Sequence, residues 1–98
     1  MDNIFEIEDK TGRMIRLSDM GFRHIAAYHP NIVNNLELVK DALVSPLIII
    51  DNKEEEGRKL YYKMIKKDAK YLMVVVKYLN NHGYVITSFY VRSIKNER

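Results

Sequence analysis

The chain has 98 residues, of which 47% are hydrophobic and 30% charged, with a formal net charge of +3; these proportions indicate one compact domain over residues 1–98 and exclude a disordered chain. Because the sequence has no cysteine, disulfides, thiolate nucleophiles and cysteine-ligated metal sites are excluded. The acidic N-terminal segment and the short apolar runs predict neither a signal peptide nor a membrane span, so we expect a cytoplasmic protein that does not act at a membrane.

The first half of the chain predicts a hairpin and two helices. Residues 3–18 have the pattern of two short strands around a turn at Asp9–Gly12, where glycine permits a positive φ. Ser18 suits a helix N-cap, and the helix that it begins ends at Pro30. The apolar stripe of this helix consists of Met20, Phe22, Ile25, Ala26 and Ala27. Apolar spacings of three and four then predict a second helix over residues 31–45.

The second half predicts strands. β-branched and aromatic residues dominate residues 46–51, 59–66, 70–79 and 84–94, with turns at 67–69 and 80–83. Helices followed by hairpin-linked strands predict an α+β fold. In this fold the short hairpin comes first in the chain, and two N-terminal helices then pack on a four-stranded antiparallel sheet.

Period-two alternation divides the side chains of the predicted strands between two faces. In the last strand, one face carries Val85, Thr87, Phe89 and Val91, and the other face carries Tyr84, Ile86, Ser88, Tyr90 and Arg92. We expect the second set to be the more exposed. In residues 59–66, Lys63 and Tyr62 fall on opposite sides, and Lys77 shares the parity of Met73 in the following strand.

Positive charge gathers in the C-terminal part of the chain. Residues 1–56 contain 11 acidic and 6 basic residues, whereas residues 57–98 contain 10 basic and 2 acidic residues. Such a field attracts polyanions, and a basic face with tyrosines suits RNA because cations hold phosphates and phenol rings stack on bases. Lysines also keep strand edges soluble and tyrosines are favoured in strands, so a purely structural role stays open.

Two of the three histidines lie close together, at the end of the first predicted helix. His24 and Tyr28 are four residues apart and share one helix face, and His29 precedes Pro30. Packing, or the dipole at the helix C-terminus, accounts for either histidine alone. The spacing lacks a third ligand in a recognised pattern, so we expect no metal. The remaining interpretation is acid–base catalysis of phosphodiester cleavage, in which RNA supplies its own 2'-hydroxyl nucleophile and no cofactor is needed.

The order of these motifs resembles a known family. RLSDMGFRHIAAYHPNI, the amphipathic helix, and the segments SPLIII, LYYKMIKKDAKYLMVVVK and YVITSFYVRSI resemble the phage-associated barnase, EndoU, colicin and RelE-like (BECR) nucleases over residues 17–94. The most specific parts are the H-I-x-x-x-H-P run and the ITSF strand. The resemblance implies an α+β fold, a metal-independent ribonuclease site on the sheet, and a toxin-like hydrolase. An acidic antitoxin or immunity protein that covers the cationic face would hold such a toxin inactive.

Site residues follow from the resemblance and from the strand faces. The resemblance implies catalytic roles for His24, His29, Lys63 and Thr87. Face and charge add as substrate-binding residues Ser88, Tyr90, Arg92, Lys77 and Tyr62. Alternation places Thr87 on the face opposite Ser88, so either a bulge redirects the strand or Ser88 takes the place of Thr87.

Two functions are compatible with these features. The first is a metal-independent endoribonuclease that acts on RNA such as tRNA or mRNA and leaves a 2',3'-cyclic phosphate. In it His24 is the general base, His29 is the general acid or orients it, and Lys63 and Arg92 hold the phosphate. The alternative is a non-catalytic RNA- or protein-binding module that uses the basic sheet face and has structural histidines.

Overall fold

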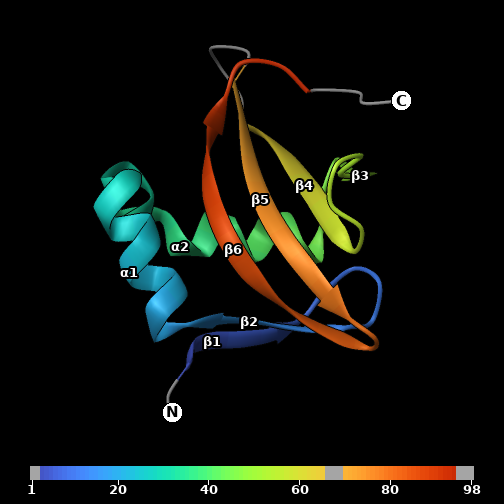
Figure 1. The fold of residues 1–98 in the computed structure, drawn as a ribbon. Helices are drawn as coiled ribbons and strands as arrows, with labels where there is room; N and C mark the ends of the chain where they lie inside the picture. The colour runs from blue at the N-terminus through green and yellow to red at the C-terminus, as the bar shows by residue number, and fades with distance from the viewer. Residues whose placement is uncertain (1–2, 66–69, 95–98) are drawn as a thin grey trace.

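A mixed β-sheet with helices on one face makes up residues 3–65 and 70–94, the part of the chain that the computed structural model describes (Figure 1). The elements in chain order are β1 (Asn3–Glu8), β2 (Met14–Ser18), α1 (Asp19–Tyr28), η1 (Pro30–Asn35), α2 (Leu36–Val44), β3 (Ile48–Asp51), β4 (Arg58–Ile65), β5 (Lys70–Leu79) and β6 (His82–Val91). The predicted α+β class is confirmed, and the helices lie between β2 and β3, after the hairpin and before the remaining strands.

The sheet has six strands in the order β1-β2-β6-β5-β4-β3, and not the predicted four. Neighbouring strands are antiparallel except β2 and β6, which pair in parallel from Met14↔His82 to Arg16↔Tyr84. The N-terminal hairpin is therefore one edge of the main sheet and not a separate unit. Alternation within single strands carries no information on this pairing, because it joins segments far apart in the sequence.

The first helix begins and packs largely as its sequence predicts. The Ser18 N-cap is confirmed, since its hydroxyl accepts a hydrogen bond from the Gly21 N–H at 3.0 Å. Ile25 is fully buried, whereas Met20 is 75% exposed and Ala27 is also exposed. The predicted apolar stripe is thus too wide, and one side of α1 faces solvent.

A 3₁₀ helix separates the two α-helices. Pro30–Asn35 forms η1, so α2 begins at Leu36 and not at Asn31 as predicted. Proline has no backbone N–H and a fixed φ, which favours the first position of a new helical turn. Apolar spacing does not separate a 3₁₀ turn from an α-helix over so short a stretch.

Strand bounds agree with the prediction to within a few residues. β5 spans the predicted residues 70–79, and β4 begins at Arg58. β6 begins at His82, so the predicted turn over residues 80–83 shortens to Asn80 and Asn81, with φ of 64° at Asn80. The predicted turn at residues 67–69 lies outside the described residues.

Apolar side chains gather on both faces of the sheet. On the covered face, which α2 crosses (Figure 1), the main core joins helix residues such as Ile25 and Val39 to strand residues such as Val74. The opposite face, here called the open face, carries a smaller buried cluster of Leu60, Tyr62, Met73 and Val75. Neither α-helix in the described part of the chain is long and apolar enough to cross a bilayer.

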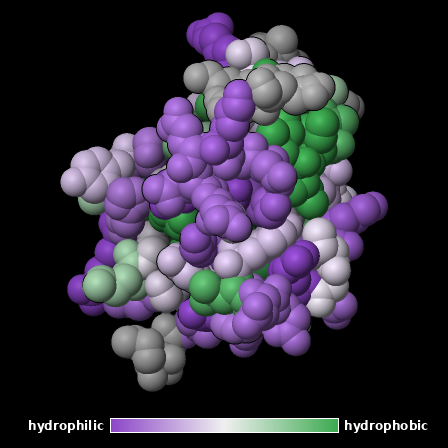
Figure 2. Space-filling view, turned by 45° about the vertical axis from the view of Figure 1, so that its right-hand side comes forward, coloured by the Kyte–Doolittle hydropathy of each residue, from purple (hydrophilic) through white to green (hydrophobic). Residues whose placement is uncertain are grey.

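The side of the molecule around β3 and the end of β4 exposes apolar residues. Leu47, Ile48 and Met64 are 52%, 43% and 52% exposed. Figure 2 brings this side forward and shows hydrophobic residues gathered beside a hydrophilic area. Together with the apolar cluster on the open face, these residues show that the sheet carries more apolar surface than the predicted face of basic residues and tyrosines.

A buried polar cluster fastens the hairpin to the sheet. The Tyr61 hydroxyl donates a hydrogen bond to the carboxylate of Asp9, and the Tyr78 hydroxyl lies 2.6 Å from the same Tyr61 oxygen. The Asp9 carboxylate also accepts from Thr11 N and Oγ1 and from Arg13 N, at 2.7–3.0 Å. Burial, followed by these hydrogen bonds, raises the pKa of Tyr61 far above its usual range. Tyr61 is therefore neutral and able to donate at physiological pH.

Candidate functional site

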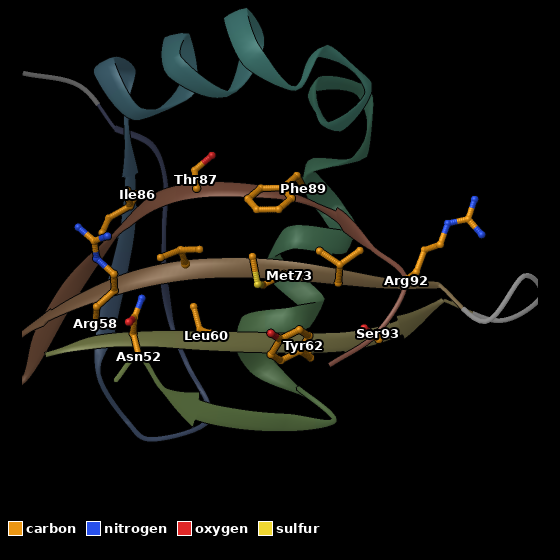
Figure 3. A pocket seen from close by; sticks show the side chains of 12 residues that line it. Asn52, Arg58, Leu60, Tyr62, Met73, Ile86, Thr87, Phe89, Arg92 and Ser93 are labelled. Atoms are coloured by element: carbon orange, nitrogen blue, oxygen red, sulfur yellow. The ribbon is translucent and has the colours of Figure 1, made fainter. Parts of the chain in front are cut away.

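A pocket of about 450 Å³ opens on the open face of the sheet (Figure 3). Its floor is apolar, and polar side chains stand around its rim. The lining residues are Asn52, Arg58, Leu60, Tyr62, Met73, Val75, Ile86, Thr87, Phe89, Val91, Arg92 and Ser93. β4, β5 and β6 supply most of them, so the pocket lies across three neighbouring strands of a rigid sheet.

A β-bulge in β6 decides which side chains reach this pocket. Val76 pairs with Val85 and Val75 pairs with Thr87, so Ile86 is an extra residue in β6. Before the bulge Val85 belongs to the covered core, and after it Thr87 and Phe89 line the pocket. The bulge resolves the sequence-based conflict in favour of Thr87, and the simple alternation over residues 84–94 is wrong from this point onward.

The same bulge turns Ser88 and Tyr90 to the covered face. Ser88 is fully buried, and its hydroxyl donates to the Met73 carbonyl at 2.9 Å. Tyr90 packs against the main core, and its hydroxyl accepts from Asn35 Nδ2 at 3.2 Å. The expectation that these two side chains share the more exposed face is corrected, because one inserted residue reverses every later position.

Thr87 and Arg58 place buried polar atoms in the pocket wall. Within residues 3–65 and 70–94, Thr87 Oγ1 and Arg58 Nε are the buried side-chain polar atoms that have no hydrogen-bond partner. Figure 3 shows the Thr87 hydroxyl pointing from β6 toward α1. Buried polar groups are nearly always hydrogen-bonded, and exceptions gather where a ligand supplies the partner. Because both residues also line the pocket, they are candidates for contact with a ligand.

His29 brings an imidazole to the same strand. It caps the C-terminal end of α1, where its N–H donates to the Ile25 carbonyl at 2.7 Å. Its ring stacks on Phe89, with centroids 4.7 Å apart and planes inclined by 20°. Because Phe89 lines the pocket two residues after Thr87, the imidazole lies at the pocket's border on the α1 side.

Close packing of α1 along β6 makes this contact possible. A Cβ atom at Gly21 would lie 3.3 Å from the Val85 carbonyl oxygen and 3.1 Å from Leu17 Cδ1. Glycine therefore allows the start of the helix to approach the strand, and His29 meets the same strand at the other end. The side chain of His24 is exposed on α1 and stacks on Tyr28 at 4.9 Å. The two imidazoles thus have different ring partners.

The predicted cations do not all reach the pocket. Lys63 pairs with Leu72, whose side chain belongs to the covered core, so Lys63 projects from the covered face. Arg92 is exposed and lines the pocket. Lys77 pairs with Arg58 across the strands, and its ammonium donates to the Glu56 carbonyl at 2.9 Å. Arg92 is thus the predicted cation that lines the pocket, and Arg58, which was not predicted, lines it as well.

Sequence reasoning identified part of the pocket. Tyr62, which is only 1% exposed, lines it as a buried ring and not as a free surface tyrosine. Arg58 and Phe89 were not predicted as site residues. Phe89 shares the alternation parity of Thr87, which is the one signal in the sequence that pointed to it. Arg58 opens a strand after a charged turn and carries no local signal.

The arrangement of these groups suits phosphodiester chemistry. Imidazole exchanges protons near neutral pH, a hydroxyl donates to a developing oxyanion, and guanidinium groups bind phosphate through paired donors. Aromatic and apolar side chains line the same pocket. The side chains concerned lie on β4 (Arg58), on or just after β6 (Thr87 and Arg92) and at the end of α1 (His29).

Comparison with known proteins agrees with this chemistry. The model of the family described as phage-Barnase-EndoU-ColicinE5/D-RelE like nuclease2 matches residues 3–98. No curated protein and no solved structure matches the chain significantly.

Proposed function

Since this chain belongs to that family of nucleases and its substrate is therefore a nucleic acid, we propose that it is a metal-independent endoribonuclease that cleaves RNA at the open-face pocket. RNA carries its nucleophile in the 2'-hydroxyl, so the protein needs to supply acid–base groups and charge stabilisation. The product would then be a 2',3'-cyclic phosphate.

One observation carries this proposal. The imidazole of His29 stacks on Phe89, beside the strand segment that carries Thr87, a residue that lines the pocket and has a buried, unpartnered hydroxyl. A proton-transfer group and an oxyanion donor thus come from two different elements to one border of the pocket. The Thr87 hydroxyl has no hydrogen-bond partner among the described residues, and a rotation of this side chain toward the pocket gives it a phosphate oxygen as acceptor.

The residues divide the work as follows. His29 exchanges a proton with the reacting oxygens, and His24, one α1 turn earlier, is the second acid–base group. Thr87 donates a hydrogen bond to a non-bridging phosphate oxygen. Arg92, exposed at the end of the pocket, holds the phosphate. Lys63 lies on the covered face and is not assigned a part in the reaction.

A toxin-like role extends the proposal. The positive charge of residues 57–98 and the two arginines of the pocket would attract an acidic inhibitor protein as well as RNA. Expression in bacteria is then expected to arrest growth, and the His29→Ala variant is expected to relieve that arrest. Growth that continues with an active nuclease present would speak against a toxin.

The decisive experiment is cleavage of a fluorogenic RNA by the purified full chain in excess chelator. We expect RNA cleavage with 2',3'-cyclic phosphate ends, and its loss in the double variant His24→Ala, His29→Ala. Cleavage that requires a divalent metal, or that survives the double substitution, contradicts the mechanism. Salt-sensitive RNA binding without cleavage, unchanged by the histidine substitutions, supports a non-catalytic RNA-binding module instead.

A further inference from the structure

We propose that the open-face pocket binds one nucleobase of the RNA, next to the phosphodiester that is cleaved, an inference that rests on the proposed function. The pocket reaches beyond the group of His29, Thr87 and Arg92 that handles the phosphate. Part of its lining lies on β4 and β5 and not on β6 or the segment that follows it, namely Arg58, Leu60, Tyr62, Met73 and Val75. A further part of the substrate therefore fits there.

The size and composition of the pocket suit a flat heteroaromatic ring. Its volume of about 450 Å³ falls within the range of roughly 300–1,000 Å³ typical of small-ligand sites. Leu60, Met73 and Val75, each less than 10% exposed, form an apolar floor. The rings of Tyr62 and Phe89 line the same pocket. Apolar and aromatic surfaces of this kind bind bases largely by stacking and exclusion of water.

Arg58 gives the pocket a polar group for the edge of a base. Its Nε is buried and has no hydrogen-bond partner among the described residues, and its Nη2 lies 3.9 Å from a Glu55 carboxylate oxygen. The Arg58 side chain as a whole is 33% exposed, so the terminal N–H groups of its guanidinium can donate to an acceptor in the pocket. Every nucleobase carries ring or carbonyl acceptors on its edge, so a bound base would satisfy Arg58.

This donor favours a base over an apolar side chain of a protein partner. A leucine or phenylalanine inserted into the pocket would cover the floor formed by Leu60, Met73 and Val75 but would give the Arg58 guanidinium no acceptor. A nucleobase covers the floor and accepts the hydrogen bond. Phe89 connects the two parts of the site, because it lines the pocket and stacks on His29. A base in the pocket therefore lies beside the acid–base group.

The first test measures how much the base contributes to nucleotide binding. The full-length protein, labelled with ¹⁵N and ¹³C-methyl groups, is titrated with each nucleoside 5'-monophosphate and with ribose 5-phosphate as the baseless control. We expect at least one nucleotide to shift the methyl signals of Leu60 and Val75, and ribose 5-phosphate to leave them unchanged. Equal shifts with ribose 5-phosphate, or none with any nucleotide, overturn the inference.

The second test uses cleavage. An RNA with one abasic residue at the nucleotide adjacent to the cleaved bond is expected to lose roughly tenfold or more in kcat/KM. The Val75→Phe variant, which fills the pocket, is expected to cleave intact and abasic RNA alike. Arg58→Gln is expected to reduce the preference of the nuclease for one of the four bases at that position. Lys59→Gln changes the next residue of β4, which projects from the covered face, and is expected to keep the preference.

The two proposals fail in different ways. If the protein binds nucleotides at Leu60 and Val75 but cleaves no RNA, the nuclease mechanism is wrong and the base pocket remains. If it cleaves intact and abasic RNA equally well, the base pocket is wrong and the nuclease mechanism remains. Thermal unfolding of Val75→Phe and Arg58→Gln shows whether a loss comes from misfolding, and Arg58→Gln replaces the filled variant if the latter is unstable.

Discussion

The imidazole of His29 lies flat on the ring of Phe89, with centroids 4.7 Å apart. This contact joins the C-terminal end of α1 to the part of β6 that follows the bulge. It fixes the proposed proton-transfer group against β6, two residues from Thr87, which lines the pocket. Preorganisation of this kind is what acid–base catalysis requires, since the group has to reach a reacting oxygen without rearrangement.

The first prediction concerns the two histidines of α1. His29→Ala is expected to lower the rate of RNA cleavage by about 10²- to 10⁴-fold, the usual contribution of a positioned acid–base group. His24→Ala is expected to have the smaller effect, because the His24 ring stacks on the exposed Tyr28 and not on a residue of the pocket. Single-turnover rates on one RNA in excess chelator measure both.

The third histidine is the matched control for this prediction. His82 begins β6, and its Nδ1 lies 3.4 Å from Arg16 Nη1, away from the pocket lining. His82→Ala is expected to retain the wild-type rate. A larger loss of cleavage rate in His82→Ala than in His29→Ala would show that the acid–base role is assigned to the wrong histidine.

The second prediction separates stability from activity at Thr87. Thr87→Val keeps the shape of the side chain but removes a buried hydroxyl, so the free energy of unfolding is expected to stay the same or rise. Cleavage is expected to fall by about 10- to 10³-fold, as when an oxyanion donor is lost. Thr87→Ser keeps a hydroxyl and is expected to retain more activity than Thr87→Val. Denaturant unfolding and initial cleavage rates, measured on the same preparations, test both expectations. A Thr87→Val variant that is less stable but fully active would contradict the assignment.

Local signals in the sequence predicted the local structure well. Ser18 is the N-cap of α1, and residues 70–79 form β5. These features depend on side chains and backbone within a few residues of each other. The 3₁₀ turn of Pro30–Asn35 escaped prediction, because Ile32 and Leu36 fit an α-helical spacing equally well.

Non-local pairing accounts for the larger errors. The register of β6 against β5 inserts Ile86 as an extra residue, which moved Ser88 to the covered face and Thr87 to the open face. Nothing in the sequence from Val85 to Phe89 marks that insertion, since each residue fits a strand. The parallel pairing of β2 with β6 likewise depends on where a distant strand returns, and the sequence of the hairpin alone does not specify it.

The third prediction compares two cations on opposite faces. Arg92→Ala is expected to weaken RNA binding and to lower the slope of log K against log salt by about one, as expected when one phosphate contact is lost. Lys63→Ala is expected to change neither, because Lys63 pairs with Leu72 and projects from the covered face. The RNA-binding constant, measured at several salt concentrations in the presence of a chelator, gives the slope. A stronger effect of Lys63→Ala than of Arg92→Ala would place the RNA on the covered face.

The fourth prediction concerns the hydrogen bond between Tyr61 and Asp9 in the buried cluster. Tyr61→Phe is expected to lower the free energy of unfolding at pH 7 by about 1–3 kcal/mol, because the Asp9 carboxylate loses a buried donor. Cleavage per folded molecule is expected to stay unchanged, since Tyr61 belongs to the covered core and lies outside the pocket lining. Tyr28→Phe, at a tyrosine that is 70% exposed, is the control and is expected to unfold like the wild type.

The pH dependence of that difference tests its cause. Burial raises the pKa of Tyr61 in the folded state, whereas an unfolded tyrosine titrates near pH ~10. The stabilising contribution is therefore fully present below pH ~10 and is lost progressively as the pH rises above that value, by up to about 1.4 kcal/mol per pH unit. The gap between wild type and Tyr61→Phe is expected to be constant from pH 6 to about 9 and to shrink above pH ~10. A difference in unfolding free energy that widens above pH ~10 would mean that Tyr61 ionises more readily in the folded protein than in the unfolded chain. Its hydrogen bond to the Asp9 carboxylate would then not keep the tyrosine protonated.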